Sequence, residues 1–362
     1  MPEVSVTPGA DRLLARMSDL LLNPRSMGAT GHVPGDDGRD HAADGGVHPR
    51  PATPLPESPP KATQKQSDLR KRILTAAVLV PIVAYVIVAG GYLYLATVLA
   101  FGLLAQREFY GLIEDKGARP LVGLGLGFGA AVICVAYAGT EYMAMLLMTA
   151  SLLVLMVAQL RKAQITEALG SISGTFFGVF YVAWLLSHAV QLRFFYHSSL
   201  AHYSVVELAS LEVNPDTGIF LMFYCLAVVV LCDAGAYFAG RAWGRRKLAP
   251  EISPNKSVEG ALGGIVTGTV GGLIFKGVFD LFWPSLSAGF PWSIAIPFGI
   301  VLSVVGIIGD LVESLLKRDA DVKDTGALLP GMGGILDRID APLLALPVMY
   351  YMLLGYAFTQ VG

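Results

Sequence analysis

Long apolar runs separated by short polar segments fill the chain from about residue 70 onward. Nine runs lie at roughly 73–90, 91–112, 121–138, 141–160, 170–191, 217–240, 261–282, 292–314 and 341–360. An α-helix rises about 1.5 Å per residue, so each run is about long enough to cross ~30 Å of hydrocarbon. Helices also satisfy every main-chain polar group within one segment, as lipid requires. The pattern predicts an all-α polytopic integral membrane protein with about nine transmembrane helices.

Composition supports this class. Of the 362 residues, 54% are hydrophobic and only 15% are charged, which excludes an ordinary soluble domain. The three cysteines all fall within apolar runs, so we expect neither a disulfide framework nor a thiolate metal site. The seventh run has glycine at every fourth position, which predicts close packing against another helix. These glycines are Gly260, Gly264, Gly268 and Gly272.

Basic residues lie at alternate connections between the runs. Lys and Arg precede the first run and follow the second, fourth, sixth and eighth, whereas the other connections carry almost only Arg193. Loops rich in Lys and Arg stay on the cytoplasmic side of a membrane. We therefore expect a cytoplasmic N-terminus and a C-terminus outside.

Three regions follow from these patterns. Residues 1–67 hold ten of the 21 prolines within their first 60 positions and should form a disordered cytoplasmic tail. An apolar helical face at 11–22 is better explained as a fluctuating helix than as a binding element. We expect no cleavable signal peptide, because the first long apolar run begins only at Ile73. Residues 68–216 should hold the first five spans, and residues 217–362 the last four.

Polar residues that suit phosphate chemistry gather between 310 and 340. Asp310, Ser314 and Lys317 share one helical face, and the glycine-rich loop at 330–334 lets main-chain N–H groups approach an anion. Interleaved acids and bases suit phosphates bridged to a divalent metal, whereas an ordinary solvated loop explains the whole set less well. The charged members are Asp310, Lys317, Arg318, Lys323, Asp324, Asp337, Arg338 and Asp340.

A second polar group lies at the end of the sixth run and in the loop after it. Asp233 stands inside an apolar segment, where a charge costs about 2.5 to 3.5 kcal/mol at mid-membrane, so it should have a partner or a function. The basic residues at 245–247 are explained by topology and contact with anionic lipid. Ser253, Lys256 and Glu259 follow them.

Both groups resemble one known signature. The run Ser314-x-x-Lys-Arg318, Lys323-Asp324, Pro330-Gly-x-Gly-Gly334, x-x-Asp337-Arg-x-Asp340 is similar to that of the phosphatidate cytidylyltransferase, or CDP-diacylglycerol synthase, family. Asp233-x-x-Ala-Tyr with Ser253-Pro-Asn-Lys256-Ser-x-Glu259-Gly resembles the upstream motif of the family. The resemblance covers about residues 70 to 360. One departure is Met332, where the family usually carries His.

The resemblance implies transfer of a cytidylyl group from CTP to phosphatidic acid, giving CDP-diacylglycerol and pyrophosphate in phospholipid biosynthesis. It also implies Mg²⁺ or another divalent cation, and is compatible with a second cation. Asp310 and Asp337 are the expected metal ligands. The catalytic group would comprise Lys317, Arg318, Lys323, Asp324, Arg338 and Asp340. Substrate-binding residues would be Asp233, Ser253, Lys256, Glu259, Ser314, Gly333 and Gly334, with the two glycines offering main-chain donors.

The chemistry explains why histidine is dispensable. A phosphate monoester has a second pKa of about 6, so the nucleophile is already anionic and needs no general base. The reaction needs charge neutralisation and in-line alignment instead. We therefore expect an active enzyme despite Met332. Asp340 has an alternative explanation as the N-cap of the last span, before Ala341-Pro342.

Three alternatives remain open from the sequence. A relative of the same superfamily would take another lipid phosphate or lipid alcohol. A CDP-alcohol phosphotransferase needs Asp-Gly-x-x-Ala-Arg, which Asp233-Ala-Gly-Ala does not supply. An ion-coupled transporter could use Asp233, Lys276 and Asp280, but most of the acids lie at span ends rather than at the midplane. Expected partners are CTP, phosphatidic acid and the bilayer, with no nucleic acid, and a homodimer is compatible. We expect a bacterial plasma membrane location with the site facing the cytoplasm.

Overall fold

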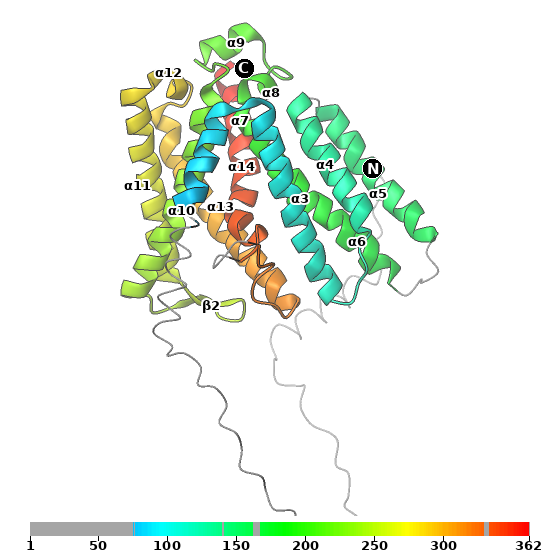
Figure 1. The fold of residues 1–362 in the computed structure, drawn as a ribbon. Helices are drawn as coiled ribbons and strands as arrows, with labels where there is room; N and C mark the ends of the chain where they lie inside the picture. Colours follow the sequence, from blue (N-terminus) through cyan, green and yellow to red (C-terminus); the bar gives the residue numbers. More distant parts are fainter. Residues whose placement is uncertain (1–74, 76, 140, 162–166, 329–332, 362) are drawn as a thin grey trace, which may run out of the picture. The chain divides into compact units, whose positions relative to one another are not determined.

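The described part of the chain is a bundle of helices, shown as a computed structural model in Figure 1. It comprises residues 75, 77–139, 141–161, 167–328 and 333–361, which all belong to one unit. The predicted tail at 1–67 and the departure at Met332 lie outside these residues.

Helices coincide with all nine apolar runs. The first half of the described chain contains a helix at Ala77–Ala89, α3 (Gly91–Asp115), α4 (Val122–Ala138), α5 (Glu141–Leu160), α6 (Ala168–Gly178), the π-helix η1 (Val179–Trp184), α7 (Leu185–Arg193), α8 (Phe195–Ser199) and α9 (Val205–Ser210). The second half contains α10 (Thr217–Trp243), α11 (Val258–Phe282), α12 (Pro284–Ser287), α13 (Trp292–Asp319) and α14 (Leu336–Val361). The fifth run thus corresponds to α6, η1 and α7 together.

Six helices in the described residues are long and apolar enough to cross a membrane, which makes the chain an integral membrane protein. They lie at Tyr142–Leu160, Ala168–Arg193, Thr217–Trp243, Val258–Phe282, Trp292–Asp319 and Leu336–Val361. Two shorter apolar helices lie at Ala77–Ala89 and Val122–Ala138. Helix α3 is long but polar in its second half, where it carries Arg107, Glu108, Glu114 and Asp115.

The basic loop after α10 departs from the predicted all-α fold. It folds into a two-stranded antiparallel hairpin of β1 (Lys247–Ala249) and β2 (Ser253–Ser257), in which Lys247 pairs with Ser257. The Ser257 hydroxyl then accepts a hydrogen bond from Gly260 N (3.1 Å) and caps the start of α11. The hairpin thereby fixes the position from which Lys256 reaches the bundle.

Close packing of α10 on α11 depends on the predicted glycine ridge. A Cβ added at Gly260, Gly264 or Gly268 would lie 2.9, 2.8 and 2.8 Å from main-chain oxygens of α10, closer than real Cβ atoms come. Only glycine leaves room for this approach, so the ridge acts as scaffold, as predicted.

A second close approach brings α13 against the start of α14. A Cβ at Gly309 would lie 2.7 Å from Asp340 O and 3.1 Å from Ala341 Cα. Because α14 begins at Leu336, Asp340 lies inside the helix. The alternative explanation of Asp340 as an N-cap was therefore wrong, since the helix extends one turn further toward the signature loop than the apolar pattern does.

Candidate active site

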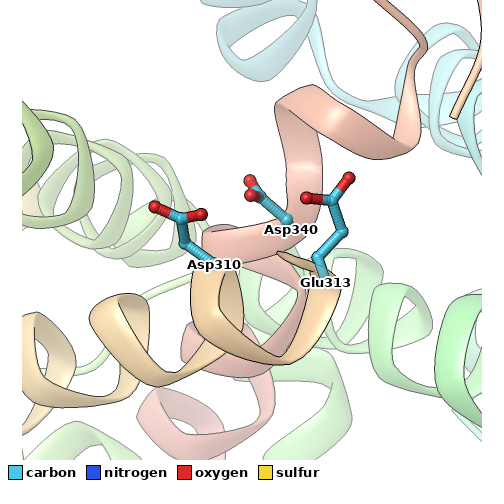
Figure 2. Close-up of side chains that lie close together, drawn as sticks. All are labelled: Asp310, Glu313 and Asp340. Carbon is cyan, nitrogen blue, oxygen red and sulfur yellow. The ribbon is translucent and has the colours of Figure 1, made fainter. Parts of the chain in front are cut away.

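Three carboxylates gather where α13 crosses α14. Figure 2 shows Asp310 and Glu313 on α13 beside Asp340 on α14. One oxygen from each lies within 4.8 Å of the others. Asp310 and Glu313 are three residues apart and so share a helix face, whereas Asp340 is placed by the close approach at Gly309. Hard divalent cations prefer clusters of carboxylate oxygens of this kind.

Two lysines neutralise part of this charge. Lys317 Nζ lies 2.6 Å from Glu313 Oε2 and 2.8 Å from Asp337 Oδ1. Lys256, on β2, forms an ion pair with Asp310. The predicted mixture of acids and bases is therefore interleaved in space as well as in sequence.

Glu313 carries an unsatisfied oxygen. Its side chain is only 1% exposed, and its Oε1 has no hydrogen-bond partner. A buried carboxylate oxygen without a partner costs free energy. The chemistry of this donor set therefore fits an oxygen-liganded divalent cation, which would satisfy it.

Asp337 organises the loop before α14. Its Oδ2 accepts hydrogen bonds from Thr325 N (3.1 Å) and Gly334 N (2.8 Å), while Oδ1 binds Lys317. Gly333 has φ +86°, which an L side chain rarely adopts, and its added Cβ would lie 2.6 Å from Asp337 Oδ2. The main-chain donor predicted at Gly334 is thus engaged within the protein, and Asp337 shares Lys317 with Glu313.

A cavity of about 660 Å³ opens beside the cluster. Its walls carry six acids, namely Asp233, Asp310, Glu313, Asp324, Asp337 and Asp340, and four bases, namely Arg241, Lys256, Lys317 and Arg338. The formal sum of six negative and four positive charges is −2. A surplus of two negative charges suits one divalent cation, and the four bases suit phosphate oxygens.

The cavity includes most predicted site residues. Its lining contains Asp233, Ser253, Lys256, Asp310, Lys317, Asp324, Asp337, Arg338 and Asp340. The other predicted residues do not line it. Ser314 Oγ donates to Asp310 Oδ1 (3.4 Å), and Arg318 Nε donates to Ile252 O (3.4 Å). Glu259 accepts from the main chain of Arg245 and Arg246, and Lys323 is exposed.

Sequence reasoning missed three residues at or beside the site. Glu313 could have been found, because it lies one helical turn from Asp310. Arg241 donates to Tyr237 Oη (3.2 Å) and lines the cavity at the end of α10. Glu108, on α3, contacts the loop before α14, and no local pattern marks it.

The fold and the site define an integral membrane protein with a carboxylate and lysine centre at the crossing of two helices. Comparison with known proteins gives the family. The chain matches the model of the cytidylyltransferase family over residues 70–355, and it belongs to that family.

Several bacterial phosphatidate cytidylyltransferases are similar to this chain. The protein of Synechocystis sp. is 30% identical over 303 residues, which cover 78% of this chain and 95% of the relative. That of Bacillus subtilis is 44% identical over 164 residues, or 45% and 57% of the two chains. That of Haemophilus influenzae is 39% identical over 177 residues, or 46% and 58%. The matched stretch thus spans little more than half of the last two relatives. The resemblance drawn from the signature residues is confirmed.

Proposed function

We propose that this chain transfers the cytidylyl group of CTP to phosphatidic acid. The phosphatidate oxygen attacks the α-phosphorus of CTP, the bond from that phosphorus to the β-phosphate oxygen breaks, and CDP-diacylglycerol and pyrophosphate form. The observation that carries this proposal is the cavity itself, in which three carboxylates that fit a cation lie beside four bases that fit phosphates. The names of the relatives support the same reaction.

The carboxylates of Asp310, Glu313 and Asp340 would hold the divalent cation, which when bound neutralises polyphosphate charge. Asp337 stays a predicted ligand, although in this structure both of its oxygens accept hydrogen bonds. Lys317 orients Glu313 and Asp337 by its two ion pairs. A second cation and a homodimer remain predictions.

Four basic side chains would hold the phosphates. Lys256 and Lys317 lie next to the acidic cluster, while Arg241 and Arg338 are more exposed on the cavity wall. Guanidinium groups bind phosphate oxygens in a bidentate manner and fix their orientation. Positioning and charge neutralisation are what phosphoryl chemistry with an ionised nucleophile requires. No proton transfer from a side chain is needed when the nucleophile is already ionised.

We also propose nine spans, with the N-terminus and the cavity on the cytoplasmic side of a bacterial plasma membrane. Positive residues at alternate connections support this orientation. Arg193 is the main basic residue at the connections on the opposite side. It is only 4% exposed and donates to Ile87 O (2.6 Å) and Val88 O (3.3 Å). It caps the end of the helix at Ala77–Ala89 and is therefore not a solvated positive charge. We also propose that residues 68–216 form the N-terminal transmembrane helices and that residues 217–362 form the catalytic transmembrane domain.

A transfer assay tests the reaction. Purified protein in lipid micelles is incubated with radiolabelled CTP and Mg²⁺, with or without phosphatidic acid. We expect labelled lipid only with phosphatidic acid and a divalent cation. Label transferred to an isoprenoid phosphate or a lipid alcohol but not to phosphatidic acid would instead support another superfamily reaction. No labelled lipid with any acceptor would contradict the proposal.

A further inference from the structure

Glu108 connects the N-terminal helices to the loop that carries the candidate site. Its carboxylate accepts hydrogen bonds from Ile335 N (3.0 Å), Leu336 N (2.8 Å) and the Thr325 hydroxyl (3.2 Å). These donors lie 217 to 228 residues further along the chain. A single side chain of α3 thus contacts the loop between α13 and α14 at Thr325 and again at its last residue, Ile335.

Two of these donors belong to the N-terminus of α14. The helix begins at Leu336, so the N–H groups of Ile335 and Leu336 have no acceptor within the helix. A carboxylate at a helix N-terminus satisfies such donors and interacts favourably with the helix dipole. Glu108 therefore caps α14 from another helix.

Glycines make room for this carboxylate. A Cβ added at Gly326 would lie 2.6 Å from Glu108 Oε1, and its three nearest atoms all belong to Glu108. A Cβ at Gly334 would lie 2.4 Å from Glu108 Oε2. Both distances are shorter than real Cβ contacts, so any side chain at either position would displace the carboxylate.

We propose that Glu108 is a positioning residue that holds the start of α14 in place for cytidylyl transfer, an inference that rests on the proposed function. The route is short. The first turn of α14 carries Asp337, which binds Lys317, which in turn binds Glu313. Asp340 follows within the same helix. Loss of the cap would shift Asp337 and Asp340 relative to Asp310 and Glu313 on α13.

The first experiment is a double-mutant cycle on Glu108→Ala and Gly326→Ala. Each single variant should lower kcat by about tenfold or more, because small displacements of reacting groups are costly, while the KM for CTP changes less. In the Glu108→Ala background, Gly326→Ala should cause no further loss, because its clash partner is gone. Glu108→Gln keeps one acceptor oxygen and should lie between wild type and Glu108→Ala. Glu114→Ala is the matched control, since Glu114 is on the same helix and pairs only with exposed Arg107 among the described ion pairs.

The second experiment does not depend on activity. Hydrogen exchange of peptides covering 333–340 should quicken in Glu108→Ala and not in Glu114→Ala, while exchange in α10 stays unchanged. Should Glu108→Ala not be recovered from membranes, Glu108→Gln replaces it in both experiments. The positioning role would be overturned if Glu108→Ala kept the wild-type kcat and the wild-type hydrogen exchange. Additive losses of kcat in the double-mutant cycle would also overturn it. A wild-type protein without transfer activity would instead refute the proposed function, and the exchange measurement would still test the cap.

Discussion

Two ion pairs, one beside each end of α11, lie in contrasting settings. At the end near β2, Lys256 pairs with Asp310 in a cavity that holds five further acids. Lys276 lies toward the other end, about 27 Å from the start of α11 at 1.5 Å per residue. It is 3% exposed and pairs with Asp280. The Asp280 carboxylate also accepts a hydrogen bond from the Ser287 hydroxyl (2.6 Å).

The two sites differ in their balance of acids and bases and in the space they leave for a ligand. At Lys276 one base meets one acid, and the rings of Phe220 and Trp292 lie 5.9 and 5.5 Å from its ammonium group. Such a satisfied pair joins α11 to α12 and fixes helix positions. The cavity instead has a surplus of acids, an unsatisfied Glu313 oxygen and room for a ligand. A charge inside an apolar run is therefore not itself a sign of function, and the transport alternative, which used Lys276 and Asp280, loses support.

The largest effect is expected for the acidic cluster. Asp310→Asn and Asp340→Asn should each lower cytidylyl transfer by about a hundredfold or more, because each removes an anionic cation ligand without changing side-chain volume. The measurement is the radiolabelled CTP assay at saturating Mg²⁺. Asp280→Asn serves as the matched control at the other end of α11 and should keep most of its activity. More than about one tenth of wild-type activity in Asp310→Asn would contradict the ligand assignment.

An intermediate effect is expected for the lysine near the cavity. Lys256→Met should lower kcat/KM by about tenfold to a hundredfold, since it removes a phosphate contact and leaves Asp310 without its partner. Lys276→Met should change kcat/KM by less than about threefold in the fraction that folds. Equal losses in both variants would remove the distinction between the two ends.

Stability should respond in the opposite order. Lys276→Met leaves Asp280, which is only partly buried, without its cation partner, and water screening keeps the cost below the about 3 to 5 kcal/mol found for fully buried pairs. Its Tm in detergent should fall clearly below that of Lys256→Met. Replacing both partners, as in Lys276→Met with Asp280→Leu, should recover part of the loss. An unchanged Tm in Lys276→Met would show that the pair does not stabilise the fold.

The smallest effect on function is expected from surface cysteines, which test orientation. In a Cys134→Ala background, Glu251→Cys in the hairpin turn and Ala288→Cys after α12 are both exposed substitutions. A membrane-impermeant thiol reagent should label Ala288→Cys in intact cells, and Glu251→Cys only after the cells are opened. Labelling of Glu251→Cys from outside would overturn the proposed orientation.

The sequence by itself determined the helices and part of the site. A helix in lipid must bond its own main chain, so length and hydropathy marked all nine helical segments without information on tertiary contacts. Helical spacing also placed Asp310, Ser314 and Lys317 on one face, as α13 shows. The glycine ridge of α11 was predictable because its period is local.

Only the tertiary structure decided which of these groups meet. Asp340 joins Asp310 and Glu313 because Gly309 lets α13 and α14 approach closely, and no periodicity encodes that crossing. Lys317 on α13 joins Glu313 to Asp337 on α14, a contact that side-chain geometry sets. Glu108 reaches Leu336 across 228 residues of chain. Such contacts depend on how packed helices juxtapose distant residues, whereas a sequence pattern reports only what neighbours along one helix can do.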